Sequence, residues 1–254
     1  MDPRNHYSWP PLSPRYDKAL RQAVRYIVRR YKPTAIIAAG TIIRGTPHPN
    51  SDLDLWVIHR KPFRQRVQKW FNGVPAEIFV NTPAAVLDHL VDERKERRPI
   101  AAHMMASGHV VLDREPCLKD LLAKARAMLK SKPRSVSKEE IIHDRYWAGS
   151  LYEDALDLAE SDPAACQVIL SRAMYEMLHA AIKRAHRYVP RDKDLLAVTT
   201  DVDAGLGQLA RAFFTAETLK DRLSVSRKIA DRTVQCRGFI EWESEPIRVL
   251  IKPK

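Results

Sequence analysis

Residues 36–58 constrain the fold of this chain more than any other stretch, because two strand-like segments there enclose a glycine turn and a pair of aspartates. The apolar run Ala35–Ala39, bounded by a proline and a glycine, is typical of a buried strand, and Leu53–Ile58 predicts a second one. Side chains two residues apart on a strand share a face, so we expect Asp52 and Asp54 to lie side by side. Because neighbouring carboxylates repel each other, a bound cation is the natural reason for keeping both.

The segment between the two strands has the composition of a turn followed by a loop. Gly40 and Thr41 turn the chain, Ile42–Gly45 predicts a short helical turn, and Gly45–Ser51 is rich in Pro, Asn and Gly. A glycine turn beside a carboxylate pair is a way for a protein to hold a nucleoside triphosphate through magnesium.

This pattern resembles the signature of the DNA polymerase β-like nucleotidyltransferases. The matching residues are Gly40-Thr41-x-x-Arg44-Gly45, then five residues, then Ser51-Asp52-x-Asp54. Within that superfamily the chain looks most like the small bacterial members, including aminoglycoside nucleotidyltransferases and minimal nucleotidyltransferases. The serine that usually follows the first glycine is a threonine here, which keeps the hydroxyl group. The resemblance covers about the first half of the chain, and the second half matches only as helical.

The resemblance also implies a third carboxylate on a following strand, and Ala76–Val80 supplies one in Glu77. In such enzymes two Mg²⁺ ions clamp the entering and departing oxygens of the reaction. We therefore expect Asp52 and Asp54 to bind the metals. Glu77 would complete the second metal site or accept the proton of the acceptor hydroxyl. The alternative for Glu77 is a strand residue that simply faces solvent.

Five further residues are candidates for binding the triphosphate. Gly40 lets the backbone approach the β and γ phosphates, and the Thr41 hydroxyl would hydrogen-bond them. Arg44 and Ser51 match the motif, but bracing the loop and capping its turn are their alternative roles. In similar two-domain nucleotidyltransferases a lysine of the helical domain reaches the triphosphate. Lys193 is the candidate here, and an ordinary loop lysine is the alternative.

The remaining part of the first half predicts further elements of an α/β (α+β) domain with a small mixed sheet. Met1–Leu12 is expected to be an arm, Arg60–Lys69 a basic connector and Asn72-Gly73 a turn into the Glu77 strand. Helices are predicted at Pro14–Tyr31, Pro83–Lys95, Pro99–Ser107 and Pro116–Leu129, and a further strand at His109–Asp113.

The second half predicts a bundle of four or five helices without strands. The segment Lys130–Ser137 reads as a linker, so we expect a nucleotidyltransferase domain in residues 1–135 and an all-α domain in residues 136–254. Helices are predicted from Ser137 to about Ser161, from Asp162 to about Tyr188, and at Val202–Ala216 and Thr218–Phe239.

Positive charge is concentrated in the half that carries the motif. Residues 1–135 hold 25 Lys and Arg against 12 Asp and Glu, whereas residues 136–254 hold 18 against 19. Such a surface attracts a nucleotide or a nucleic acid, or is merely solvated. The same alternatives, contact with RNA or solvation, apply to the basic face of the first helix, formed by Lys18, Arg21, Arg25, Arg29 and Arg30.

The second half carries two weaker features. An acidic run on its first helix would line a pocket for a polycationic acceptor, provide the base for the acceptor, or lie on a solvated face. Its members are Glu153, Asp154, Asp157 and Glu160. Arg172 and His179 faintly resemble the arginine–histidine pair of HEPN ribonucleases. A polar residue usually follows that arginine, and Ala173 replaces it here, so we expect a core or interface histidine.

No apolar run approaches the roughly 20 residues that span a bilayer, and no signal peptide is visible, so we expect a cytoplasmic protein without a membrane partner. Cys117, Cys166 and Cys236 are odd in number and lack zinc-binding or CxxC spacing. They are therefore expected to be small buried hydrophobic residues rather than a disulfide framework.

Together these features predict a magnesium-dependent enzyme that transfers AMP from ATP, or the equivalent group of another nucleoside triphosphate, to a hydroxyl of a small-molecule acceptor. An aminoglycoside-like antibiotic is one such acceptor, although the basic first half should repel a polycation unless the acidic helix offsets it. The alternatives are a macromolecular acceptor, such as a tRNA 3′ end or a partner protein of toxin–antitoxin type, and a non-enzymatic nucleotide-binding regulatory module.

Overall fold

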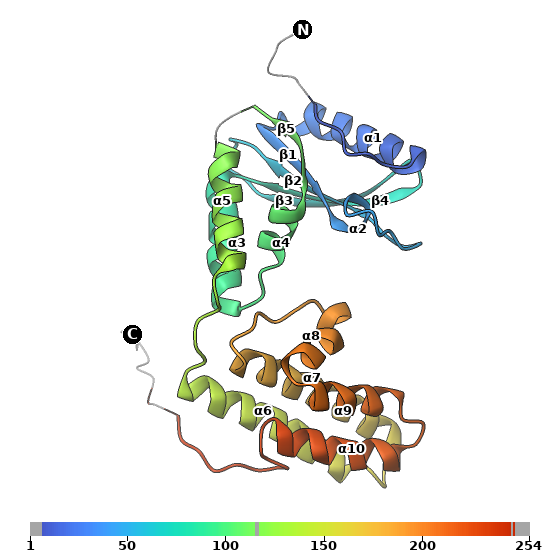
Figure 1. Ribbon diagram of the computed structural model, residues 1–254, viewed down its shortest axis with the longest axis vertical. Helices are drawn as coiled ribbons and strands as arrows, with labels where there is room; N and C mark the ends of the chain where they lie inside the picture. The colour runs from blue at the N-terminus through green and yellow to red at the C-terminus, as the bar shows by residue number, and fades with distance from the viewer. Residues whose placement is uncertain (1–6, 115–116, 245, 247–254) are drawn as a thin grey trace, which may run out of the picture. The chain divides into compact units, whose positions relative to one another are not determined.

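The computed structural model describes residues 7–114, 117–244 and 246, which fold into two compact units, residues 1–132 and 133–254 (Figure 1). The first unit is built on a five-stranded mixed sheet and the second is helical. The predicted fold class is therefore confirmed. Among the described helices, none combines the length and the apolar character needed to cross a membrane.

The sheet has the strand order β3-β4-β2-β1-β5. Strand β2 runs parallel to β4, whereas the pairs β1–β2, β1–β5 and β3–β4 are antiparallel. Its strands are β1 (Ala35–Ala39), β2 (Leu53–Ile58), β3 (Gln65–Phe71), β4 (Val74–Asn81) and β5 (His109–Asp113).

The central strands are apolar because helices cover both faces of the sheet (Figure 1). Every residue of β1 is buried, as expected for a strand with covered faces. On one face, α1 (Pro14–Tyr31) packs its buried stripe against alternate residues of β2 and β4. On the other face, Trp56 and Ile58 of β2 pack with α3 (Pro83–Glu96), α4 (Ile100–Ser107) and α5 (Cys117–Lys130). The helix α2 (Gly40–Ile43) follows β1 directly, two residues earlier than the predicted turn Ile42–Gly45.

The predicted connector Arg60–Lys69 is confirmed as irregular only for residues 60–64, and it is wrong for residues 65–69, where β3 (Gln65–Phe71) forms the edge of the sheet. This strand is mostly exposed, so its sequence is polar and lacks the apolar pattern by which a buried strand is predicted. The turn at Asn72 and Gly73 is confirmed. Both residues have positive φ, 48° and 69°, as a two-residue hairpin turn of type I′ requires.

The prediction of an N-terminal arm is wrong for residues 7–12, and Met1–His6 lie outside the described residues. Tyr7, Trp9 and Leu12 pack against the core beneath α1. The Ser8 amide donates to the Val111 carbonyl at 3.0 Å, and the Arg21 guanidinium lies 4.2 Å from the centre of a Trp9 ring. The aromatic residues near the terminus thus help to cover the sheet.

The second unit consists of five α-helices and a 3₁₀ turn among the described residues. Two long helices end earlier than predicted, at Asp157 and Arg184, and the last ends at Arg232 rather than Phe239. The segment before the third predicted helix forms a separate helix that the sequence prediction missed. The elements are α6 (Lys138–Asp157), α7 (Pro163–Arg184), η2 (Asp192–Asp194), α8 (Leu195–Val202), α9 (Ala204–Thr215) and α10 (Leu219–Arg232).

The cysteine prediction holds where the structure describes the side chains. Cys166 and Cys236 are buried and carry free thiols. Burial raises the pKa of the Cys166 thiol, which disfavours the reactive thiolate. The side chain of Cys117 lies outside the described part of the chain.

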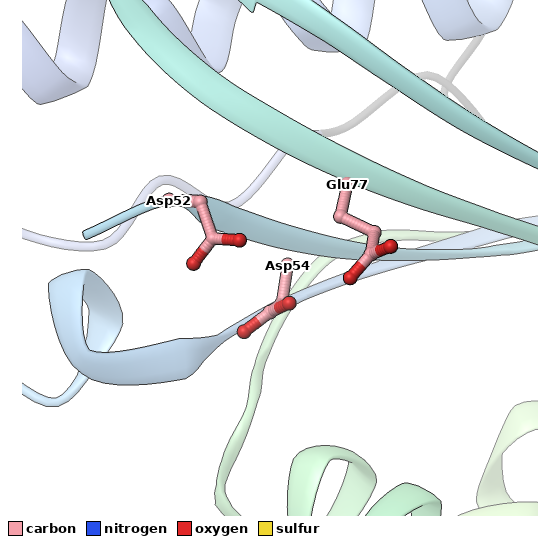
Figure 2. Close-up of side chains that lie close together, drawn as sticks. All are labelled: Asp52, Asp54 and Glu77. Carbon is pink, nitrogen blue, oxygen red and sulfur yellow. The ribbon is translucent and has the colours of Figure 1, made fainter. Parts of the chain in front are cut away.

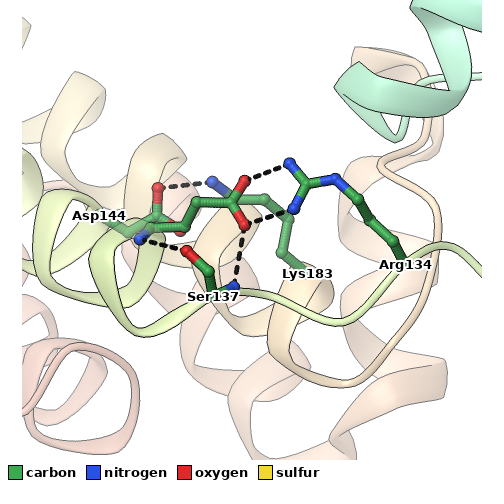
Figure 3. A network of polar contacts seen from close by, with 5 residues as sticks. Arg134, Ser137, Asp144 and Lys183 are labelled. Carbon is green, nitrogen blue, oxygen red and sulfur yellow. Dashed lines mark hydrogen bonds and ion pairs between the residues drawn. The ribbon is translucent and has the colours of Figure 1, made fainter.

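The start of α6 is held by a capping box, the reciprocal pair of hydrogen bonds between an N-cap side chain and the third helical residue (Figure 3). The Ser137 hydroxyl accepts from the Glu140 amide at 3.2 Å, and the Glu140 carboxylate accepts from the Ser137 amide at 2.9 Å. The Arg134 guanidinium donates two hydrogen bonds to that carboxylate, at 2.7 and 2.8 Å. One turn further on, the Lys183 ammonium on α7 pairs with Asp144 at 2.5 Å. This network fixes the direction in which the chain enters the bundle.

Substitution of Ser137 by Ala should lower the free energy of unfolding of the helical unit by about 1 kcal/mol, because the Glu140 amide loses its acceptor. The measurement is chemical denaturation followed by circular dichroism. Ser161→Ala, at an exposed position in the turn after α6, is the matched control and should leave the unfolding midpoint unchanged. Equal effects of the two substitutions would contradict the capping role.

Candidate functional site

The two aspartates of the motif lie at the start of β2, beside the end of β1. Antiparallel pairing sets Asp54 opposite Ala39, the last residue of β1. Asp52 precedes the strand by one residue, and both side chains extend on the same side of the sheet (Figure 2). The prediction that these two carboxylates lie side by side agrees with this arrangement.

Glu77 joins them because β2 and β4 run parallel in a register that pairs Asp54 with Glu77. The neighbours of Glu77 on β4, Ala76 and Ile78, point into the core beneath α1, so Glu77 points to the opposite face, as Asp54 does. One carboxylate oxygen of each residue lies within 4.8 Å of those of the other two. We call Asp52, Asp54 and Glu77 the acidic cluster. All three are half-buried, and together they are the group of potential metal ligands found in the described part of the chain.

Gly40 is required where it stands because Asp54 approaches it closely. Its φ is +89°, a conformation that side chains rarely adopt. A Cβ at this position would lie 2.6 Å from Oδ2 of Asp54, well inside the contact distance of the two atoms. The glycine therefore allows both the sharp turn into α2 and the position of the aspartate.

Thr41 and Ser51 connect the two ends of the loop that precedes β2. Their hydroxyl oxygens are 2.8 Å apart, and the Ser51 hydroxyl also accepts from the His48 amide at 2.8 Å. Ser51 thus closes the turn before Asp52, which is the structural role that its sequence position allowed. Arg44 follows α2 and is exposed, so it is available to a ligand at the loop surface.

Two residues of β3 contact the acidic cluster, and neither was predicted from the sequence. The Arg66 guanidinium donates to Oε1 of Glu77, and Gln68 donates to the same oxygen at 3.2 Å. The hydrogen bond to Glu77 raises the pKa of Arg66, which also lies over the Phe79 ring at 5.2 Å. A signal was present in the Asn-Gly turn, since a hairpin turn requires a strand on both sides.

The remaining candidates lie in the second unit. Lys193 is exposed in η2, and its role stays a prediction. The acidic residues Glu153, Asp154, Asp157 and Glu160 are all exposed on or just after α6, as on a solvated helix face. Arg172 lies over the Trp147 ring at 5.7 Å, and the His179 ring contacts that of Tyr175 at 4.1 Å. These ring contacts give both residues a packing role.

The acidic cluster has the chemistry of a magnesium site. Magnesium binds oxygen at about 2.0–2.1 Å, so two oxygens on one ion lie at most about 4.2 Å apart. Oxygens already within 4.8 Å of one another need only small rotations to reach that spacing. A cation would also offset the mutual repulsion of the carboxylates. Arg66 supplies part of that positive charge from the edge strand.

Comparison with solved structures finds similarity to the crystal structure of a nucleotidyltransferase-like protein from Exiguobacterium sibiricum 255-15. The TM-score is 0.50 at 14% sequence identity, over 85% of this chain and 73% of that one. At this identity the likeness shows the fold alone. No known family model matches the sequence, and a search of curated proteins also finds no match. The chain therefore has a nucleotidyltransferase-like fold, and its sheet gathers three carboxylates on one face.

Replacing Gly40 by Ala should abolish divalent-cation binding at the acidic cluster, because the new methyl group displaces the Asp54 carboxylate. Gly45→Ala is the matched control. Gly45 also has positive φ, +78°, but no atom lies within 4 Å of its Cβ position. Both variants should lose about 1 kcal/mol of stability through backbone strain, and only Gly40→Ala should lose Mn²⁺ binding, measured by calorimetry. Equal Mn²⁺ affinity of the two variants would contradict the displacement.

Arg66→Gln should raise the affinity for Mn²⁺ about fivefold, because the guanidinium and a metal ion compete for the same Glu77 oxygen. The factor corresponds to the ~1 kcal/mol that an exposed ion pair is worth at most. Arg64→Gln removes an equal charge from the exposed segment just before β3 and should leave the affinity unchanged. Unaltered or weaker binding by Arg66→Gln would show that Glu77 is not a ligand.

Proposed function

We propose that this protein is a magnesium-dependent nucleotidyltransferase that moves a nucleoside monophosphate from a nucleoside triphosphate to a hydroxyl group, with pyrophosphate leaving. The observation that carries the proposal is the acidic cluster, whose carboxylate oxygens lie within 4.8 Å of one another beside the Gly40 turn. The nucleotidyltransferase-like fold supports it.

In this proposal Asp52, Asp54 and Glu77 hold two Mg²⁺ ions. Magnesium retains several waters and takes few protein carboxylates, so three acids are sufficient ligands. Bound magnesium would offset the negative charge that develops on the attacking and departing oxygens. Glu77 completes the second metal site or takes the proton from the acceptor hydroxyl.

The loop around α2 would hold the triphosphate. Without a side chain at Gly40, the phosphates can approach the backbone closely. Thr41 offers its hydroxyl as a donor, and Ser51 orients it through their 2.8 Å contact. The exposed Arg44 would add a charge-assisted hydrogen bond to a phosphate oxygen. Lys193 of the second unit is proposed as a further phosphate contact.

For the transferred group and its acceptor, we propose AMP from ATP and a hydroxyl of a small molecule. The second unit supplies enough chain to build an acceptor site, since its residues 133–254 form a helical body with its own core. An aminoglycoside-like polycation is the less favoured acceptor of this class, because the first half of the chain is strongly basic.

A macromolecular acceptor, an RNA end or a partner protein, is the second candidate. The observation that favours it is the surplus of positive charge in residues 1–135, where 25 basic residues stand against 12 acidic ones. Such a field raises the local concentration of anionic partners.

One experiment separates these acceptors. The protein is incubated with magnesium and each of ATP, CTP, GTP and UTP, labelled at the α-phosphate, together with aminoglycosides, tRNA or cell lysate. Label on a small product, on RNA or on a protein band identifies the acceptor class. Label retained only in the nucleotide, with all acceptors present, would contradict transferase activity.

The double substitution Asp52→Asn with Asp54→Asn should reduce turnover at least about a thousandfold, matching the several kcal/mol that metal-assisted charge stabilisation supplies. It should also remove Mn²⁺ binding. The control is Asp88→Asn with Glu96→Gln, two exposed acids on α3 that give the same change in charge. Retained turnover in the first variant would refute the assigned metal site.

A further inference from the structure

The face of the sheet opposite the acidic cluster carries an open hollow of about 540 Å³ that is lined by Gln22, Arg25, Tyr26, Arg29 and Arg30. We call this feature the α1 hollow. All of its lining residues come from α1. Lys69 of β3 also approaches it, since its ammonium group lies 5.6 Å from the centre of the Tyr26 ring. Cations from a helix and from the edge strand thus meet at one surface.

These cations are not neutralised by nearby acids. The only acid of α1 is Asp17, which is paired with Arg21 at 2.8 Å. The sequence contains no acid between Asp54 and Glu77, the stretch that includes β3. Arg25 and Arg29 are exposed and form no ion pair with another described residue. Their charge is therefore available to an external anion.

The spacing of the cations fits an extended anion better than a single phosphate. Lys18, Arg25 and Arg29 are seven and four residues apart, so they form one stripe along the helix. At a rise of 1.5 Å per residue the stripe is about 16 Å long. Successive phosphates of one nucleic-acid strand are separated by about 3.4 Å along a duplex axis. A stripe of this length therefore spans several phosphates.

The apolar face of α1 packs against the sheet, so it is not available to insert into a lipid bilayer. Leu20, Ala23 and Ile27 are fully buried against the sheet. The outward face offers cations, Gln22 and part of Tyr26, but no exposed aliphatic or aromatic side chain that would insert into acyl chains. Amphipathic helices that lie on membranes keep such an apolar face available.

We propose that the α1 hollow and the stripe beside it bind the phosphodiester backbone of a nucleic acid. The guanidinium groups of Arg25, Arg29 and Arg30 are matched to phosphate oxygens by charge and by their forked donors. Contacts of this kind position a nucleic acid without reading its sequence. This surface lies on the face of the sheet away from the acidic cluster, so the binding is independent of metal chemistry there.

The test is fluorescence anisotropy with full-length protein and labelled single strands of RNA and of DNA, about 16 nucleotides long. Affinities are measured from about 50 to 200 mM salt. For the five cations of the surface (Lys18, Arg25, Arg29, Arg30 and Lys69) the log–log salt slope should be about 3.5 in magnitude, at about 0.7 per phosphate contact. The RNA and DNA arms identify which of the two strands is preferred.

The decisive variant is Arg25→Gln with Arg29→Gln and Lys69→Gln. The magnitude of its log–log salt slope should be smaller than that of the wild type by about 2. Its matched control removes three exposed cations from α5 of the same unit, Lys119→Gln with Lys124→Gln and Arg126→Gln, and should keep the wild-type slope. The double variant Arg25→Gln with Arg29→Gln leaves β3 intact and should lose about 1.4 of the slope.

Equal loss in the α5 control would overturn the proposal, because the binding would then reflect net charge alone. A flat salt dependence, absence of binding to both nucleic acids, or equal competition by poly-L-glutamate would also overturn it. Binding to vesicles of phosphatidylserine and phosphatidylcholine, without binding to RNA or DNA, would assign the surface to membranes instead. Asp52→Asn should lose metal binding and keep nucleic-acid binding, so the two proposals fail separately.

Discussion

The parallel pairing of β2 with β4 is the constraint on which the acidic cluster depends. Asp52 and Asp54 are close in sequence and share a face through the alternation of a strand. Glu77 comes from a different strand, and only the register that sets it opposite Asp54 brings it to the same place. A shift of one residue would turn Glu77 into the core beneath α1 and leave Ala76 or Ile78 beside Asp54. The apolar neighbours of Glu77 prevent that shift, since Ile78 and Val80 must remain buried.

Charge within the first unit is divided between the two faces of the sheet. The acidic cluster lies on one face, and α1, which covers the other face with its apolar side, presents its basic stripe outward. Strand β3 serves both, because its side chains alternate. Arg66 and Gln68 extend toward Glu77, whereas Lys69 extends toward Tyr26 of α1. An exposed edge strand without a single acid can therefore supply positive charge to both surfaces.

Much of this arrangement could be predicted from sequence because local patterns determine it. The apolar runs of β1 and β2, the stripe of α1 and the glycine turn each follow from a few adjacent residues. The start of α6 could also be predicted from sequence, since Ser137 and Glu140 have the spacing of a capping box. Strand β3 could not be predicted in this way, because its exposed residues carry no apolar alternation and two of its seven residues are Arg66 and Lys69. Its presence is fixed by hydrogen bonds to β4, which a reading of single segments does not detect.

The close approach of Gly40 and Asp54 is a part of the motif that the sequence does not predict. The sequence spacing of the motif reveals that a glycine precedes the aspartates, but not that the missing side chain makes room for a carboxylate oxygen. The approach of a phosphate to the backbone and the position of the Asp54 carboxylate would then both depend on the absence of a Cβ atom at Gly40. A larger residue would disturb both, since the turn and the carboxylate occupy one small volume. The glycine is therefore tied to the site through packing as well as through backbone conformation, and the two contributions separate only by comparison with Gly45, whose surroundings are open.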